Sequence, residues 1–245
     1  MAAPLIIRDL VVRFDGRVAL DSLDLDVPAG STLAVIGPNG SGKSTLFKAI
    51  VGLARPSAGS VDVGGARVAL VLQSTDVDRS VPITVHDTVA IARYATLGLV
   101  RRFGPADRQA VQESMARLGV DGLADRQLHD LSGGQRQRVL VAQGLAQDAE
   151  ILLLDEPVTG LDVVSRGAIL DVIDEERDRG RTVIVTTHDL EDAKRCDQVL
   201  LLATRPIAVG PPEEVLRERH LVVAFGGRVL RVGDDVVLDD PHHAH

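Results

Sequence analysis

The stretch TLAVIGPNGSGKST, Thr32–Thr45, decides the fold of this chain. A short aliphatic run leads directly into a loop of the pattern G-x-x-x-x-G-K-[S/T], and a helical pattern follows. Glycines let backbone N–H groups approach phosphate oxygens closely, and a helix N-terminus adds the positive end of its dipole. The stretch therefore predicts a strand, a phosphate-binding loop and a helix, and with them a site for a nucleoside triphosphate.

Two side chains of this loop have separate roles. We expect Lys43 to place its positive charge on the β- and γ-phosphates, and the Ser44 hydroxyl to ligate Mg²⁺. The residues expected to contact the nucleotide here are Gly37, Pro38, Asn39, Gly40, Ser41, Gly42, Lys43, Ser44 and Thr45.

Three more apolar runs predict buried strands, and they alternate with helical patterns. They are Arg67–Leu72, Ile151–Asp155 and Thr182–Thr187. This alternation predicts a parallel α/β core. Between about residues 74 and 135 the segments Val85–Tyr94 and Ala106–Leu118 are helical with no strand between them, which predicts an inserted helical subdomain.

Other local patterns predict how elements end. Leu46, Ile50 and Leu53 would share one face of the helix after the loop, and a helix over about Val164–Asp178 would end at Gly180. Past residue 216 an extension of about residues 217–245 would contain a hairpin that turns at 233–234.

Polar residues follow three of the predicted strands, where catalytic groups of parallel sheets gather. Asp155 can bind Mg²⁺ and the water molecules around it. Glu156, on the other side of the strand, can act as general base for water. Gln73 can touch both Mg²⁺ and that water. His188 can donate a hydrogen bond to the γ-phosphate. The expected metal-binding residues are thus Ser44, Gln73 and Asp155.

A second glycine-rich turn, LSGGQ at Leu131–Gln135, starts another helix with an S-x-x-Q cap. Its exposed N–H groups suit an anion. Because one loop cannot easily share its nucleotide with a second one, we expect a head-to-tail pair in which each copy's turn closes on its partner's ATP. The contacting residues would be Ser132, Gly133, Gly134 and Gln135. Phe14 either stacks on a purine base or fills the core.

The composition narrows the possible partners. The chain has 245 residues, a net charge of −8 and a single cysteine, Cys196. A net negative charge argues against a general affinity for nucleic acid, and one cysteine allows no intrachain disulfide. No run approaches the roughly 20 apolar residues that a membrane-spanning helix needs, so we expect the chain not to cross a membrane by itself.

From Leu5 to Leu216, these motifs in this order resemble the ATP-binding cassette (ABC) family. The resemblance implies a P-loop NTPase core with an N-terminal antiparallel β part and an inserted α-helical subdomain. It implies an ATPase that binds ATP and Mg²⁺, with Phe14 stacked on adenine. Thr159–Asp162 would be the D-loop, with Asp162 at the dimer seam.

The resemblance also implies partners and a location. Two cassettes, as a homodimer or a pair, would sandwich two ATP molecules and drive a membrane permease through the helical subdomain near Gln73. A substrate-binding protein outside the membrane would act indirectly, and no nucleic acid would take part. The chain would lie peripherally on the cytoplasmic face of the plasma (inner) membrane.

Within the family, three segments resemble the bacterial manganese, zinc and iron importers: Val81–Val111, Ile207–Leu216 and Val223–Val232. A divalent metal ion is therefore the expected cargo. The chain departs from the family pattern at Leu72, Arg79, Gln143 and Gly144, where proline, tryptophan, arginine and alanine are usual. The open alternatives are a cassette for another substrate, a non-transport cassette ATPase such as one serving iron–sulfur assembly, and a non-catalytic ATP-binding adaptor.

The histidines at the end of the chain and a group of four arginines each allow two interpretations. The tail His242–His245 could bind a transition metal or be unstructured. Arg93, Arg101, Arg102 and Arg108 could face the permease or anionic lipid, or form a solvated helical surface.

Overall fold

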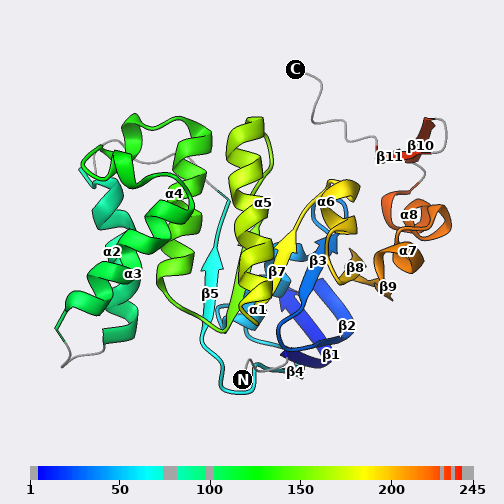
Figure 1. Cartoon of the computed structure of the whole chain (residues 1–245). Coiled ribbons are helices and arrows are strands. Elements are labelled where there is room, and N and C mark those ends of the chain that lie inside the picture. The colour runs from blue at the N-terminus through cyan, green and yellow to red at the C-terminus, as the bar shows by residue number, and fades with distance from the viewer. Residues whose placement is uncertain (1–4, 74–81, 98–101, 227–228, 233–234, 239–245) are drawn as a thin grey trace. The chain divides into compact units, whose positions relative to one another are not determined.

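The computed structural model of the chain describes residues 5–73, 82–97, 102–226, 229–232 and 235–238 (Figure 1). The chain divides into two compact units, with one boundary after Gly65 and the other within strand β7, Thr182–Thr186. Unit 1 combines Met1–Gly65 with Ile184–His245, and unit 2 is Ala66–Val183.

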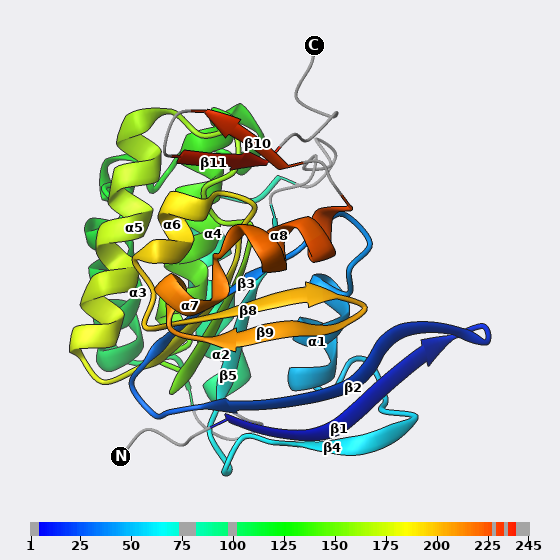
Figure 2. The same cartoon turned by 90° about the vertical axis from the view of Figure 1, so that its right-hand side faces the viewer.

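Unit 1 begins with a three-stranded antiparallel sheet in the order β2-β1-β4 (Figure 2). The strands are β1, Leu5–Phe14; β2, Arg17–Val27; and β4, Ala58–Asp62. Buried leucine, isoleucine and valine side chains of β1 and β2 alternate with more exposed residues, as expected for a sheet that covers a core with one face. The predicted antiparallel N-terminal part is therefore present.

The same unit contains the strand before the phosphate loop. Strand β3, Thr32–Ile36, is wholly buried and runs parallel to β8, Gln198–Ala203; β9, Arg205–Gly210, pairs antiparallel with β8. The helices of this unit are α1, Lys43–Ile50; α6, Leu190–Lys194; α7, Pro212–Val215; and α8, Glu218–Phe225.

Helix α1 is shorter than the sequence predicted. Gly52 has a φ of +75°, and the chain closes there with bonds from Gly52 N to Ala49 O of 3.1 Å and from Leu53 N to Lys48 O of 2.8 Å. Such a left-handed glycine ends a helix. Leu53 lies beyond it and is 75% exposed, so the prediction that it shares a buried face with Leu46 and Ile50 is wrong.

Unit 2 contains the second parallel pair. Strand β5, Val68–Val71, runs parallel to β6, Ile151–Asp155, with Val71 opposite Leu154. Helix α5, Val163–Asp178, ends as predicted at Gly180, which has a φ of +77°. The parallel pairs and these helices confirm the α/β fold class.

Three longer helices gather beside this pair (Figure 1). They are α2, Val85–Leu97; α3, Pro105–Arg117; and α4, Gly133–Ala146. Both α2 and α3 pack on α4, with two short 3₁₀ turns, Asp121–Leu123 and Leu128–Asp130, leading into it. The helices predicted around residues 85–94 and 106–118 are confirmed.

Arg93 is a structural residue of this helical group. Its guanidinium donates to Asp107 Oδ1 over 3.1 Å from Nε and 3.0 Å from Nη2, and Nη1 donates to Ala146 O over 2.8 Å. The side chain is buried, so the expectation that Arg93 faces a membrane partner, lipid or solvent is wrong. Of the other three arginines, Arg102 and Arg108 are exposed, and Arg101 lies outside the described residues.

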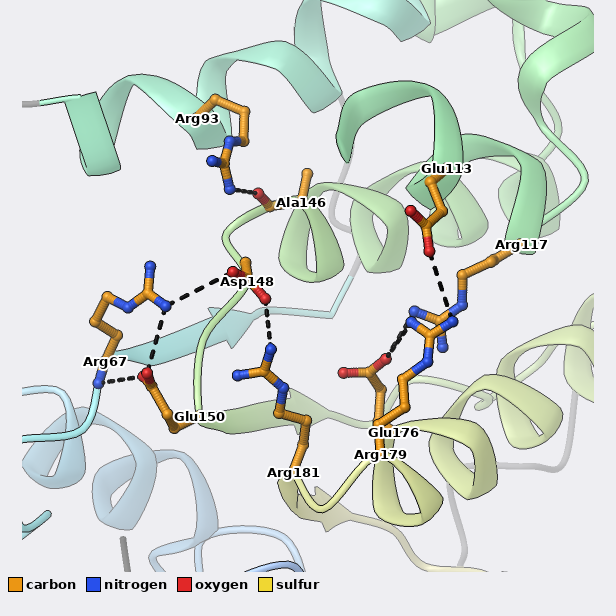
Figure 3. Close-up of polar contacts among 10 residues, drawn as sticks. All are labelled: Arg67, Arg93, Glu113, Arg117, Ala146, Asp148, Glu150, Glu176, Arg179 and Arg181. Atoms are coloured by element: carbon orange, nitrogen blue, oxygen red, sulfur yellow. Dashed lines mark hydrogen bonds and ion pairs between the residues drawn. The ribbon is translucent and has the colours of Figure 1, made fainter. Parts of the chain in front are cut away.

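A second set of ion pairs joins elements of unit 2 (Figure 3). Arg117 of α3 contacts Glu175 over 2.8 Å and Glu176 over 2.7 Å, both on α5. Near the starts of β5 and β6, Arg67 and Arg181 share the carboxylate of Asp148, at 3.7 Å and 2.5 Å. These ion pairs therefore link α3 to α5, and they link the segments that lead into β5 and β6.

Gly144, one of the departures from the family pattern, lies where α4 crosses the strands. A Cβ atom at this position would collide with Val71 Cγ2 and approach Leu152 Cδ1 to 3.4 Å. Glycine is needed there because the helix backbone packs directly on β5 and β6.

The end of the chain contains the predicted hairpin. Strands β10, Val229–Val232, and β11, Asp235–Leu238, pair antiparallel, with Val232 opposite Asp235 on either side of the turn. The turn itself, Arg79 and the histidines of residues 242–245 lie outside the described residues. Among the helices that the structure describes, none is long and apolar enough to cross a bilayer.

Candidate functional site

The phosphate loop in unit 1 has the close backbone packing that its glycines allow. A side chain at Gly37 would collide with the carbonyl oxygen of Leu202 on β8. Gly40 and Gly42 have φ values of +80° and +104°, which other residues rarely adopt. A Cβ atom at Gly42 would also lie 2.6 Å from Ala19 O, so the loop lies against β2.

Lys43 and Ser41 have the surroundings expected in a phosphate-binding loop. Lys43 is buried, and its Nζ donates to the carbonyl oxygens of Gly37, over 2.7 Å, and Pro38, over 3.3 Å, which holds the ammonium group over the loop. Ser41 Oγ is buried and has no hydrogen-bond partner among the described residues. No side chain caps α1, so its first N–H groups can meet an anion.

Ser44 is exposed at the start of α1, where its hydroxyl can meet a cation. A hydroxyl oxygen of this kind suits Mg²⁺, which prefers oxygen ligands and keeps part of its water shell. Pro38, Asn39 and Thr45 belong to the same turn between β3 and α1.

Phe14 ends β1, in the hairpin whose second strand touches the loop. Its side chain is 48% exposed, so it does not fill the core. The structure therefore excludes the interpretation that Phe14 fills the core, and it leaves the ring accessible to a base. Its contact with a base stays a prediction.

His188 lies at the same end of β3 as the loop. Thr187 N donates to Val35 O over 3.2 Å, which places the end of β7 beside the end of β3. His188 follows at once and is half-buried. Next in the chain, Asp189 caps α6 by accepting from Glu191 N over 2.8 Å, which fixes the backbone after the histidine.

In unit 2 the predicted acidic residues lie where β6 ends. Asp155 is the last residue of the strand and is buried, and Glu156 follows with a φ of +47°. Because β5 and β6 are parallel, with Val71 opposite Leu154, Gln73 emerges at the same edge and is exposed. The left-handed backbone of Glu156 is strained, and such strain at a non-glycine residue often marks a functional position.

The LSGGQ turn has the predicted capping box. Ser132 Oγ accepts from Gln135 N over 3.2 Å, and Gln135 Oε1 accepts from Ser132 N over 3.1 Å. Gly133 has open space where a Cβ atom would stand. The N-terminus of α4 is therefore formed in the free chain and is open at Gly133.

Asp162 begins α5 next to this turn. Its carboxylate accepts from Ser165 N over 2.9 Å and from Ser165 Oγ over 2.8 Å. These bonds, above all the one from the backbone N–H of Ser165, hold the pKa of Asp162 below its usual value. Ser165 was missed by sequence reasoning, since nothing local marks a serine three residues into a helix as the partner of another element.

Another missed contact supports the phosphate loop. Thr204 N donates to Ser41 O over 2.8 Å, and Asp21 N donates to Thr204 O over 2.8 Å. The turn between β8 and β9 thus joins the loop to β2, although these residues are far apart in the sequence.

The predicted site residues therefore form three groups. Unit 1 brings together the phosphate loop, the Phe14 hairpin and His188. Within unit 2, Gln73 shares an edge with Asp155 and Glu156, and the turn of Ser132, Gly133, Gly134 and Gln135 lies against Asp162.

Known proteins resemble this chain in sequence along most of its length. The family model for ABC transporters matches residues 20–159. The manganese transport system ATP-binding protein MntA of Synechocystis is 40% identical over 223 residues, which cover 87% of this chain and 86% of that protein. The zinc transport system ATP-binding protein TroB of Treponema pallidum is 39% identical over 229 residues, covering 90% and 86%.

A solved structure has the same fold along nearly the whole chain. A metal-chelate type ABC transporter in an inward-facing conformation contains a chain that matches with a TM-score of 0.83 and 26% identity. The match covers 97% of this chain and 96% of that one.

Proposed function

This chain belongs to the ABC transporter family as an ATP-hydrolysing, ATP-binding subunit of an importer, and on that premise we propose that its cargo is a divalent metal ion. One observation carries this proposal: relatives named for manganese and zinc transport are 36–40% identical along most of the chain. The similarity extends beyond residues 20–159, the part that the family model matches.

The geometry of unit 1 supports the roles that we propose for the phosphate-binding residues. The loop residues bind the phosphates through backbone N–H groups, Lys43 adds its charge, and the exposed ring of Phe14 stacks on the base. We assign Ser44, Gln73 and Asp155 to Mg²⁺. Bound Mg²⁺ would neutralise the charge that builds up on the phosphate oxygens during hydrolysis.

Glu156 is the proposed general base. It takes a proton from the attacking water, while Gln73 orients that water and His188 donates a hydrogen bond to the γ-phosphate. These three residues speak against a non-catalytic adaptor, which needs neither a base nor a residue that positions water.

The cassette works as a pair. The turn Ser132–Gln135 of one copy contacts the ATP of the other through the N-terminus of α4, so ATP favours the closed pair and hydrolysis releases it. An exposed apolar pair supports such an interface: Val163 and Val164, which follow Asp162, are 87% and 73% exposed.

The membrane subunits bind the helical part of unit 2. Leu72, just before Gln73, is exposed, and so are Ile91 and Tyr94 of α2, at 50% and 60%. Apolar side chains of this size on a surface are typical of a protein interface. Through these subunits, the chain would lie on the cytoplasmic face of the membrane, and a binding protein on the other side would deliver the ion.

The test is ATPase activity of the chain reconstituted with its membrane subunits and binding protein in liposomes. Mn²⁺, Zn²⁺ and Fe²⁺ are each offered on the side of the binding protein. We expect one of these ions to stimulate hydrolysis and to accumulate across the bilayer. Full ATPase activity that responds to none of them would exclude metal import and leave the cassette assignment intact.

A further inference from the structure

The N-terminal ends of α4 and α5 meet in unit 2 through three residues. A Cβ atom at Gly134 would lie 2.5 Å from Ser165 Oγ and 2.6 Å from Asp162 Oδ2, closer than side chains approach one another in proteins. The first turn of α4, which carries the LSGGQ turn, therefore lies directly on the cap of α5.

Ser165 is buried in this contact and is held there by Asp162. Its N–H donates to Oδ1 over 2.9 Å, and its hydroxyl donates to Oδ2 over 2.8 Å. Each oxygen of the carboxylate thus accepts a hydrogen bond from the same residue of the same chain. Hydrogen bonds to an ionised carboxylate are stronger than neutral ones, so the arrangement resists displacement.

We propose that Asp162 works within its own chain, as the residue that holds Ser165 against Gly134 and so fixes the position of α4 on α5. Asp162 and Ser165 are then positioning residues for the LSGGQ turn. The inference rests on the proposed function only for its effect on hydrolysis. The exposed groups that follow Asp162 at the proposed dimer seam are Val163 and Val164.

The position of α4 matters because its first N–H groups are those proposed to contact the partner's ATP. A displacement of about 1 Å from the productive geometry can cost about 100-fold in rate. Loss of the Asp162 or Ser165 hydrogen bonds should therefore lower kcat, and it should leave ATP binding at the phosphate loop unchanged.

The first experiment is hydrogen exchange of the full chain, with the variants Ser165→Ala, Asp162→Ala and Asp162→Asn. Asparagine caps a helix about as well as aspartate, so Asp162→Asn preserves the bond to Ser165 N. The reporters are the amides of Gln135 and Arg136 on α4, which bond to Ser132 Oγ and Ser132 O.

We expect Ser165→Ala and Asp162→Ala to speed exchange at both reporter amides about fivefold, the effect of losing roughly one hydrogen bond in the first variant and one cap in the second. In Asp162→Asn, the exchange rates of the same two amides should stay within about twofold of those in the unmodified chain. Asp189→Ala is the matched control, since it removes a carboxylate cap from α6, in the other unit, and should leave the α4 amides unchanged.

The second experiment measures steady-state ATPase activity of the same variants. The expected result is a lower kcat with an unchanged KM for ATP in the two alanine variants, and near-normal kcat in Asp162→Asn. Unchanged exchange on α4 in both alanine variants would overturn the proposal, and so would an Asp162→Asn variant as inactive as Asp162→Ala. The exchange experiment decides the proposal even if the chain hydrolyses no ATP.

Discussion

At the scale of single residues, Glu156 combines a proposed catalytic role with a strained backbone. Its φ of +47° is uncommon for a residue with a side chain and persists only where the surroundings impose it. The strain falls directly after the buried end of β6, at the position proposed for the general base. The role of Glu156 as general base stays a prediction.

We predict that Glu156→Gln lowers kcat for ATP by about 100-fold or more, because a positioned general base contributes 10²–10⁴-fold. The amide has nearly the same shape, so the Kd for ATP should change little. Steady-state hydrolysis and equilibrium ATP binding measure the two effects. Asp171→Asn, on the exposed side of α5, is the control. Normal hydrolysis by Glu156→Gln would show that another group removes the proton.

Asp162 adds a prediction about pH. Its pKa is lowered in the folded chain, chiefly by the N–H of Ser165, so ionised Asp162 stabilises the folded state. This contribution is present above about pH 5, where the unfolded chain is also ionised, and is lost as pH falls through the folded pKa. Unfolding of the chain and of Asp162→Asn should therefore differ most near pH 6, and the difference should shrink as the pH falls below about 4. A constant difference would contradict the assignment.

At the scale of elements, the fit of α4 on β5 and β6 depends on one glycine. Glycine inside a helix costs about 0.5–1 kcal/mol relative to alanine, and sequence reasoning alone therefore expects Gly144 to weaken α4. The contact with Val71 reverses this expectation, because the space for a Cβ atom is already filled.

We predict opposite effects for two glycine substitutions. Gly144→Ala should lower the free energy of unfolding by about 1–3 kcal/mol, since an extra methyl group in a packed core forces displacement. Gly167→Ala in α5 is the matched case: a Cβ atom there meets nothing within 4 Å. It should raise the free energy of unfolding by about 0.5–1 kcal/mol. Denaturant unfolding measures both, and stabilisation by both would contradict the packing described for α4.

At the scale of the molecule, the contribution of an ion pair to stability depends on how deeply it is buried. Arg117 and Glu176 leave only 12% and 10% of their side chains exposed, and they join α3 to α5. In unit 1, Arg8 and Asp26 lie 2.6 Å apart but are 49% and 66% exposed. Water and salt screen the second pair far more than the first.

We predict that Arg117→Ala destabilises the chain by about 2–3 kcal/mol, because it removes the shorter ion pair of the buried Glu176 carboxylate and leaves only Arg179, at 3.4 Å. Arg8→Ala, whose partner Asp26 is 66% exposed, should have a much smaller effect. Chemical denaturation of both variants measures the difference. Equal effects would show that the α3–α5 ion pairs add nothing beyond surface attraction.

The exposed apolar face of α2 gives a prediction for the assembled transporter. Ile91→Arg should abolish stimulation of ATP hydrolysis by the membrane subunits, since a charge would replace an apolar contact. The Kd for ATP of the chain alone should be unchanged. Asp171→Asn, an exposed change on α5, serves as the control. Normal coupling of Ile91→Arg would place the membrane subunits on another surface.

The sequence by itself determined the parts of this protein that local chemistry specifies. The phosphate loop, the four predicted strands, the ends of α5 and the terminal hairpin follow from periodicity, glycines and caps within a few residues of one another. The order of the motifs was enough to predict the family.

Only the tertiary structure decided where distant groups meet. Arg93 is buried because Asp107 and Ala146 O converge on it, and Leu53 is exposed because the chain turns at Gly52. The contact of Gly134 with Asp162 and Ser165 joins segments about 30 residues apart. No local pattern encodes such a contact, since the free energy that fixes it comes from packing and from hydrogen bonds that form only when both elements are in place.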